Sequence, residues 1–280
     1  MNRDASIENS VAQHYARSDL ERAILDGLTA SGKDIEHLTA SDLSLVDEFH
    51  TGGGEATAEL GVEAGFKPGM HILDIGCGIG GSSRYFAEAH GCHVTGIDLT
   101  ADYVRTAEAL AKRVGLADRV AYRQASAMAL PFEPATFDGA YMMHVGMNIE
   151  DKPALFAGIR RVLKAGAIFA IFDVMRTGDG ALSFPVHWAA TPEMSFVDSA
   201  ETYRRALDAA GFELRKERNR FEYAREVFRQ AKARAVTGGG PPPLGTHLLM
   251  KADVPQKLAN VIDAIEKGLI APVELICSAR

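Results

Sequence analysis

The chain has 280 residues, 47% of them hydrophobic and 24% charged, and its 30 basic and 37 acidic residues give a net charge of −7. This is an ordinary globular composition, which excludes a disordered chain and a small disulfide scaffold. Nucleic acids and anionic membranes need a concentrated basic surface, so neither is expected as a partner of a chain with a pI near 5.7. A neutral or cationic small molecule fits the charge better.

The cysteines and the apolar runs indicate the compartment. Cys77, Cys92 and Cys277 are odd in number and follow no disulfide framework spacing, as in intracellular proteins. The first residues contain no apolar run, and the most apolar stretch, residues 167–175, is too short to span a bilayer. We therefore expect a soluble, cytoplasmic protein with no membrane partner.

The elements expected in chain order begin with a helical arm over residues 1–65, which ends in the triple glycine Gly52 to Gly54 and a short helix. Residues 66–220 then alternate short apolar runs with helical segments, the pattern of βαβ units that form a parallel sheet. The expected strands are 71–75, 93–98, 120–123, 137–143 and 167–172. The expected helices between them are 82–90, 102–114 and 152–163.

The C-terminal part completes the predicted sheet. A helix over 199–210, with Ser199 as N-cap and Gly211 as its stop, precedes a strand at 212–215. Residues 221–269 read as a helical insertion, a cap or an oligomer contact, with helices at 221–236 and 254–267 broken by the glycine and proline loop 238–243. Residues 270–280 return as the last strand, at 272–277. The predicted fold is α/β, a doubly wound, Rossmann-like, mostly parallel seven-stranded sheet.

A glycine loop follows the first predicted strand, and it has two interpretations. Residues 76–81 fit G-x-G-x-x-G, and Asp98 ends the next strand 98 − 76 = 22 residues later, which is also the spacing of dinucleotide sites. Asp74, two residues before the loop, favours a different ligand, because its carboxylate would repel a pyrophosphate and attract an ammonium group. The ligand predicted is a nucleoside that carries a cationic amine.

Five segments in order resemble the motifs of class I S-adenosyl-L-methionine (SAM) dependent methyltransferases. They are residues 73–81, 96–99, 130–132, 137–138 and 161–166. The similarity covers roughly residues 50–220 and is greatest to the small-molecule enzymes of the methyltransferase type 11 group, which include quinone-biosynthesis, sarcosine/dimethylglycine and phosphoethanolamine methyltransferases. The resemblance implies SAM as cofactor.

The resemblance also implies roles for particular residues. Asp74 would hold the methionine amine, Gly76 and Gly78 would let the methionine part approach the backbone, Asp98 would accept both ribose hydroxyls, and Leu99 would pack on adenine.

One segment departs from the family. Where the family has an Asp after the third strand to accept from the adenine amine, this chain has Ser126. A hydroxyl makes a weaker bond than a carboxylate, so the backbone amides of Ala127 and Met128 are expected to share that contact.

The catalytic candidates are His144, just after the fourth strand, and Tyr15, in a segment that resembles the family's N-terminal arm. His144 has a side chain suited to proton transfer, and Tyr15 could orient the methyl acceptor or the methionine carboxylate. Two other interpretations stay open: His144 as a histidine that only supports the cofactor through its backbone, and Tyr15 as an aromatic anchor of the first helix. Met143 is expected to line the cofactor pocket.

Three further segments contain histidine or tryptophan side chains that could bind a ligand or a metal. His50 with the following glycines could line the active edge or could only loosen the start of a helix. His90 to His93 is not expected to bind metal, because its side chains would point to different faces and no fourth ligand stands at zinc spacing. Trp188 could hold a methylated ammonium by cation–π attraction or could anchor a homodimer.

The sequence therefore predicts a SAM-dependent methyltransferase that acts on an N or O atom, or on a C atom, of a small metabolite. Two alternatives remain: an NAD(P)-dependent oxidoreductase on a similar sheet, and a non-catalytic protein with a SAM fold. The methyl acceptor is not specified by any residue pattern.

Overall fold

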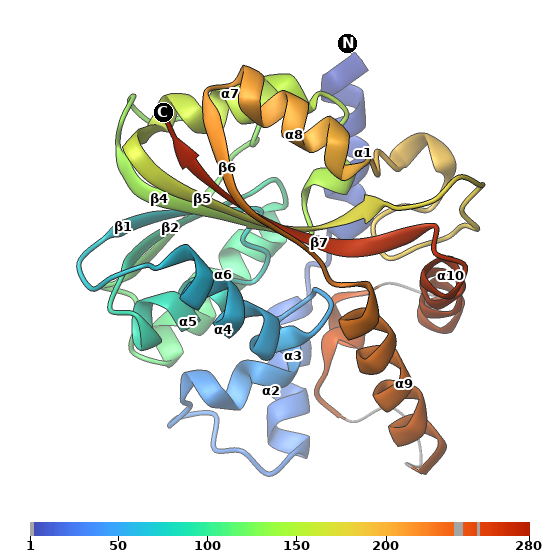
Figure 1. Ribbon diagram of the computed structural model, residues 1–280. Coiled ribbons are helices and arrows are strands. Elements are labelled where there is room, and N and C mark those ends of the chain that lie inside the picture. Colours follow the sequence, from blue (N-terminus) through green and yellow to red (C-terminus); the bar gives the residue numbers. More distant parts are fainter. Residues whose placement is uncertain (1–2, 238–242, 251–252) are drawn as a thin grey trace.

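The computed structural model describes residues 3–237, 243–250 and 253–280, and a seven-stranded sheet with the order β3-β2-β1-β4-β5-β7-β6 forms its centre (Figure 1). The strand order reverses between β1 and β4, which pair in parallel, so the predicted doubly wound, Rossmann-like α/β fold is confirmed. The strands are β1 His71–Ile75, β2 His93–Asp98, β3 Val120–Gln124, β4 Phe137–Met143, β5 Leu163–Arg176, β6 Phe212–Asn219 and β7 Ile270–Ala279.

The last three strands are longer than the sequence predicts. β7 lies between β5 and β6 and is antiparallel to both, and its pairing with β5 runs from Ile168–Ser278 to Arg176–Ile270. Strand β6 forms the edge of the sheet, and its charged side chains are mostly exposed. Because an edge strand with charged residues shows little apolar alternation, its second half could not be recognised in the sequence.

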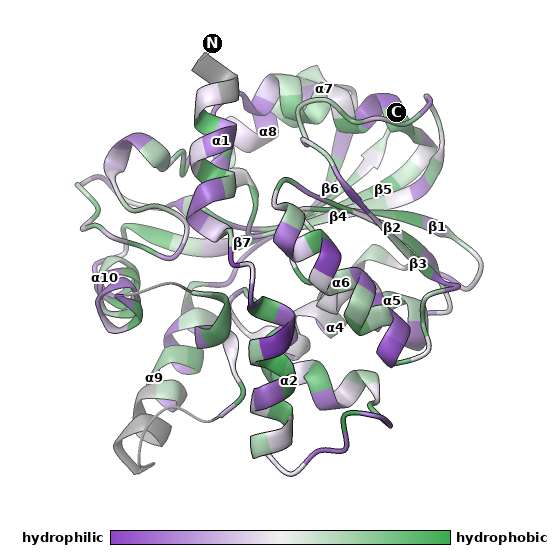
Figure 2. Cartoon of the chain, turned by 180° about the vertical axis from the view of Figure 1, so that it is seen from behind, coloured by the Kyte–Doolittle hydropathy of each residue, from purple (hydrophilic) through white to green (hydrophobic). Residues whose placement is uncertain are grey.

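Helices cover both faces of the sheet (Figure 1). One face is covered by α4 (Gly53–Ala64), α5 (Gly81–Ala89) and α6 (Ala101–Arg113), and the other by α7 (Lys152–Val162) and α8 (Ala200–Ala209). In Figure 2, α5 and α6 carry both hydrophilic and hydrophobic residues, as expected of helices with one face on a core. The buried side chains of the first face include Leu60, Phe86, Ala111, Ile72 and Tyr141, and those of the second include Leu155, Phe156, Ile159, Tyr203 and Leu207.

The N-terminal helices and part of the insertion pack together beside the carboxyl ends of the strands. They are α1 (Arg3–Tyr15), α2 (Leu20–Ala30), α3 (Ser44–Asp47) and the short 3-10 turn Thr246–Leu249. Leu244 and Leu249 of the insertion share a buried cluster with Leu20, Ile24, Val46, Tyr103 and Leu110. The insertion thus reaches the N-terminal arm and does not only extend the sheet.

The remainder of the insertion forms the helices α9 (Phe221–Thr237) and α10 (Val254–Glu266), close to their predicted ranges. They pack on the segment that follows β5, in a cluster with Val186, Trp188 and Ile270. The predicted break at 238–243 lies almost entirely outside the described residues.

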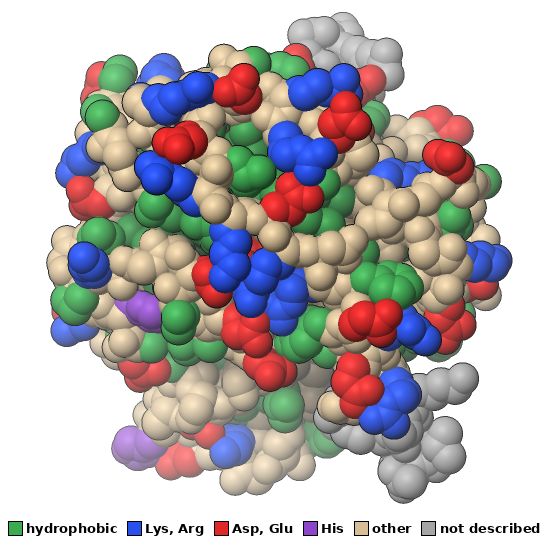
Figure 3. All heavy atoms as spheres, in the orientation of Figure 1, with side chains coloured by type: hydrophobic (Ala, Val, Ile, Leu, Met, Phe, Trp, Pro, Cys, Tyr) green, Lys and Arg blue, Asp and Glu red, His purple; other side chains and the backbone are tan. Residues whose placement is uncertain are grey.

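The face seen in Figure 3 carries basic and acidic side chains side by side. The basic residues at the end of β6 are paired: Lys216 Nζ lies 2.7 Å from Glu63, Arg218 lies 2.7 Å from Glu274 and Arg220 lies 2.7 Å from Glu59. Basic charge is therefore locally balanced by carboxylates. No helix in the described part of the chain has the length and apolar character needed to cross a bilayer.

Candidate active site

One cavity of about 400 Å³ lies at the carboxyl ends of β1, β2, β3 and β4. Every residue that the sequence singled out for cofactor or catalysis lines it, namely Tyr15, Asp74, Gly76, Gly78, Asp98, Leu99, Ser126, Ala127, Met128, Met143 and His144. The fold therefore brings together residues that lie up to 129 positions apart in the chain (144 − 15 = 129).

The glycine loop after β1 requires its glycines at specific places. Gly76 has φ +74°, and a Cβ there would lie 2.4 Å from Val145. Gly78 has φ +55°, so a side chain there would be strained as well. The backbone amides of Gly76 and Cys77 both donate to the carbonyl of Ile97 at 2.9 Å, which ties the loop to β2. The loop backbone can therefore form one wall of the cavity.

Asp74 is a buried carboxylate at the floor of the cavity. Its Oδ2 accepts hydrogen bonds from Ser83 Oγ at 2.6 Å and from Tyr141 Oη at 2.7 Å. Burial raises the pKa of Asp74 to about 7, although these two bonds lower it in part. A cationic ligand group beside it would favour the ionised form, which fits the predicted ammonium.

Asp98 ends β2, and both of its carboxylate oxygens face backbone amides. Oδ2 accepts from Gly78 at 3.0 Å and Oδ1 accepts from Thr100 at 2.8 Å. Burial raises the pKa of Asp98, and these backbone bonds oppose the rise. Each oxygen has lone pairs left for a further donor, so a pair of ribose hydroxyls fits here.

Ser126 follows β3, one strand further from the glycine loop than Asp98. Its Oγ accepts from the Met128 amide at 3.0 Å and donates to a carboxylate oxygen of Glu8, which comes from α1. No local pattern predicts this contact, because nothing in the sequence around Glu8 indicates where α1 packs.

Helix α1 covers the cavity with one face. Ile7, Glu8, Val11 and Tyr15 all line it, at the spacing of one side of a helix. His14 on the same helix lies with its Nε2 3.0 Å from the carbonyl of His187. The Tyr15 ring packs against Tyr103 with the centroids 6.0 Å apart.

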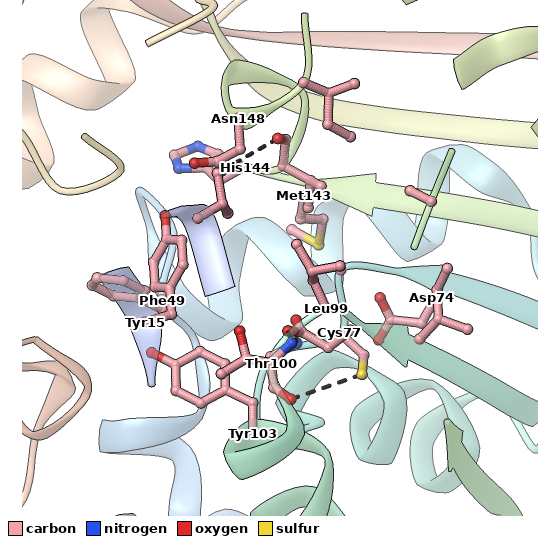
Figure 4. A pocket seen from close by; sticks show the side chains of 18 of the residues that line it. Tyr15, Phe49, Asp74, Cys77, Leu99, Thr100, Tyr103, Met143, His144 and Asn148 are labelled. Atoms are coloured by element: carbon pink, nitrogen blue, oxygen red, sulfur yellow. Dashed lines mark hydrogen bonds between the residues drawn. The ribbon is translucent and has the colours of Figure 1, made fainter. Parts of the chain in front are cut away.

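The far end of the cavity contains His144, Asn148 and the Tyr15 hydroxyl, and Figure 4 shows that hydroxyl directed toward the other two side chains. His144 has φ +55°, a left-handed conformation that is uncommon outside glycine. Burial lowers the pKa of His144 well below its ordinary value, and His50 and His187 lower it further. Within the described residues, neither Nε2 of His144 nor Oδ1 of Asn148 has a hydrogen-bond partner, although both atoms are buried.

A second histidine stands beside the first. The rings of His50 and His144 have centroids 5.9 Å apart, and His50 Nε2 lies 2.7 Å from Glu48 Oε2. Burial alone would raise the pKa of Glu48, but the bond and charge of His50 hold it below its ordinary value. Glu48 also accepts from Thr57 Oγ1 at 3.0 Å and Ser82 Oγ at 2.9 Å, so it orients His50 with the proton on Nε2.

The structure corrects the expected position of Trp188 and adds Glu48 to the site. Trp188 does not line the cavity; it is 2% exposed, packs with α9 and α10, and donates from Nε1 to Ser195 Oγ at 2.9 Å. It is neither a cation–π partner in this cavity nor an exposed contact for a second copy. Conversely, Glu48 was missed, because its importance arises only from the fold around it. The described residues hold no group of three or more His, Cys, Asp or Glu side chains that could bind a metal ion.

The fold and the cavity fit a class I SAM-dependent methyltransferase domain. A buried acid at the glycine loop, an acid at the end of β2 and an apolar surface around Leu99 fit the amine, the ribose and the base of SAM. The chain accordingly matches the family model described as "Methyltransferase domain" over residues 73–171.

Known proteins give the same classification. The chain is 38% identical over 127 residues to phosphoethanolamine N-methyltransferase 1 of Arabidopsis thaliana, across 45% of this chain and 26% of that protein. It is 36% identical over 113 residues to sterol 24-C-methyltransferase ERG6B of Gibberella zeae, across 40% of this chain and 30% of that one. The chain thus matches under a third of the length of these curated relatives.

Two solved structures resemble the fold over nearly their whole length. Geranyl diphosphate C-methyltransferase of Streptomyces coelicolor has a TM-score of 0.71 at 16% identity and covers 98% of both chains. The [4+2]-cyclase SpnF has a TM-score of 0.69 at 23% identity and covers 97% of this chain and 96% of its own. At these identities the likeness concerns the fold alone.

Proposed function

We propose that this protein transfers a methyl group from SAM to a nitrogen, oxygen or carbon atom of a small metabolite. The observation that carries the proposal is a single cavity with two chemically distinct ends. Buried acids and the glycine loop lie at the ends of β1 and β2, and His144, His50 and Asn148 lie together at the other end.

Bound SAM supplies an electrophilic methyl group on a positively charged sulfur. In this proposal Asp74 attracts the ammonium group, Asp98 accepts from the ribose, and the glycine loop lets the ligand approach the backbone. Helix α1 and Leu249 of the insertion exclude water from the cavity, because both line it. Alignment and dehydration are the main requirements of this displacement.

The acceptor end favours a substrate with an O–H or N–H group. Oδ1 of Asn148 is a buried hydrogen-bond acceptor without a partner in the described part of the chain, and His144 Nε2 is a buried nitrogen in the same condition. The lowered pKa of His144 keeps its imidazole neutral near pH 7, so one ring nitrogen can accept a proton or a hydrogen bond. Unpaired buried acceptors favour a ligand that donates to them.

His50 with Glu48 is the pair best placed to take a proton from a methyl acceptor that carries an O–H or N–H group. In this proposal the proton on Nε2 stays in the bond to Glu48, and Nδ1 receives the new proton beside the Thr51 carbonyl, which lies 3.5 Å away. Both contacts stabilise the imidazolium that forms. His144 then positions the acceptor beside it. For an acceptor that reacts as a neutral amine or at carbon, the pair would instead hold the substrate in place.

A second candidate function is suggested by the name of one structural neighbour, which describes different chemistry on a similar fold. The structure of a [4+2]-cyclase matches this chain over 97% of its length. In that case SAM would bind without transfer of its methyl group, and catalysis would depend on the shape of the acceptor end.

Methyl-labelled SAM and a metabolite extract test the proposal. We expect wild-type protein to label a small molecule and Asp98→Asn to label far less, since Asp98 holds the cofactor. SAM binding by calorimetry without any labelled product would favour the second function, and absence of SAM binding would overturn both.

A further inference from the structure

The adenine end of the cavity lacks an acid of its own. The residues after β2 and β3 that line it are Leu99, Thr100, Ala125, Ser126, Ala127 and Met128. Asp98 pairs with Gln124 across β2 and β3, so these two segments lie side by side, on the side of the glycine loop away from β4. An adenine placed there presents an exocyclic amine, which needs a hydrogen-bond acceptor.

The hydroxyl of Ser126 is already engaged. It accepts from the Met128 amide and donates its one proton to Glu8. The Thr100 hydroxyl is directed to Asp98. The strongest acceptor at this end is therefore the Glu8 carboxylate, which lines the cavity and, when ionised, can accept from several donors at once.

We propose that Glu8, on helix α1, recognises the exocyclic amine of adenine, with Ser126 holding the carboxylate in place. One oxygen accepts from Ser126 and the other accepts from the amine. The inference rests on the proposed binding of SAM and adds the residue that specifies its base.

The position of Glu8 on α1 gives the contact a second consequence. One face of α1 lies against the cavity, with Ile7, Glu8, Val11 and Tyr15. Glu8, which would recognise adenine, therefore belongs to the helix that covers the cavity. Adenine binding and the packing of α1 over the cavity are then thermodynamically coupled, because each strengthens the other. A ligand with a base that Glu8 rejects leaves the cavity less well covered.

The test compares S-adenosylhomocysteine with its hypoxanthine analogue, in which a carbonyl oxygen replaces the amine. Against Glu8 this oxygen places acceptor against acceptor, so wild-type protein should prefer the adenine ligand by on the order of a hundredfold in calorimetry. Glu8→Gln offers both a donor and an acceptor, so the preference should fall to about threefold or less. Glu8→Ala should bind both ligands weakly and without preference.

Controls separate this inference from the proposed function. Glu150→Gln removes another carboxylate that lines the cavity, from the segment after β4, and should keep the preference for adenine. Hydrogen exchange of residues 6–15 should slow when S-adenosylhomocysteine binds the wild-type protein, and much less in Glu8→Gln.

The outcomes are distinct. Equal preference for adenine in wild type and Glu8→Gln, or its loss in Glu150→Gln as well, would overturn the role of Glu8 and leave the proposed function intact. Failure of the wild-type protein to bind either ligand would overturn both.

Discussion

The backbone amide of Gly78 donates to the carboxylate of Asp98 at 3.0 Å, so the glycine loop and the acid at the end of β2 form one unit. The loop cannot shift without disturbing the acid. The proposed site accounts for a spacing shared with dinucleotide sites in this way: the loop and Asp98 would bind the nucleoside part of the ligand, and the Asp74 carboxylate would favour a cationic group over a pyrophosphate.

The first prediction concerns this unit. Asp98→Asn should weaken S-adenosylhomocysteine binding roughly ten- to hundredfold, because a charge-assisted pair of hydrogen bonds becomes at best a neutral one. Calorimetry measures the loss. Asp102→Asn is the matched control, since Asp102 does not line the cavity and pairs with Arg105. An equal loss in that variant would contradict the assignment.

The second prediction is a pH dependence of stability. The pKa of Asp74 is raised from 3.8 to about 7, so the folded protein retains a proton that the unfolded chain releases. Stability from this group is therefore lost as pH rises from about 4 to 7, with a slope of about 1.4 kcal/mol per pH unit. Asp173, whose pKa burial raises to about 6, adds to the same trend below that pH.

Asp74→Asn should flatten the upper part of this curve. Urea unfolding of wild type and variant from pH 5.5 to 8 measures the difference, which should be largest at pH 8, where the variant gains most relative to wild type. Parallel curves at all pH values would show that Asp74 titrates normally in the folded protein.

The third prediction revises what Ser126 alone suggests. Ser126→Asp restores the family's acid, but in this chain it sets a second carboxylate against Glu8. We expect weaker S-adenosylhomocysteine binding, by roughly tenfold, because two like charges meet and α1 is pushed away. The double variant Glu8→Gln with Ser126→Asp should bind better than Ser126→Asp alone; calorimetry that finds strictly additive losses would refute the coupling.

The fourth prediction addresses the acceptor end. Glu48→Gln should reduce the rate of methyl transfer about 10- to 100-fold, because His50 loses the carboxylate that stabilises its charged form. Binding of S-adenosylhomocysteine should change by no more than about threefold. Ser82→Ala, which removes one donor to Glu48 and keeps the His50 pair, should have the smaller effect on the rate. Equal rates in wild type and Glu48→Gln would exclude the pair from the reaction.

The fifth prediction separates Trp188 from the site. Trp188→Phe should lower the free energy of unfolding by about 1–3 kcal/mol, because it leaves a gap among α9 and α10 and removes the bond to Ser195. Cofactor affinity and acceptor choice should stay within about twofold of wild type. A loss of substrate binding at unchanged stability would return Trp188 to the active site.

Local patterns were enough to predict the seven strands of the sheet, although β5, β6 and β7 were predicted too short. The strand β4 was predicted to the residue, and the helices of the core lie within about two residues of their predicted ends, because apolar periodicity, glycine stops and the Ser199 cap are local signals. The same patterns placed Asp74 and Asp98 at the ends of predicted strands. Because β1 and β2 pair in parallel, both residues lie at the same edge of the sheet. Charged β6 gave no such signal, and it was predicted too short.

The sequence by itself determined the class of domain and the residues at the ends of its strands, since those depend on short-range spacing. Only the tertiary structure decided which distant groups meet them: Glu8 at Ser126, Glu48 and His50 at His144, and Leu249 at the cavity wall. It also placed Trp188 in the core. These contacts depend on how α1 and the insertion pack against the sheet, and such packing is governed by surfaces that are assembled only when the whole chain has folded.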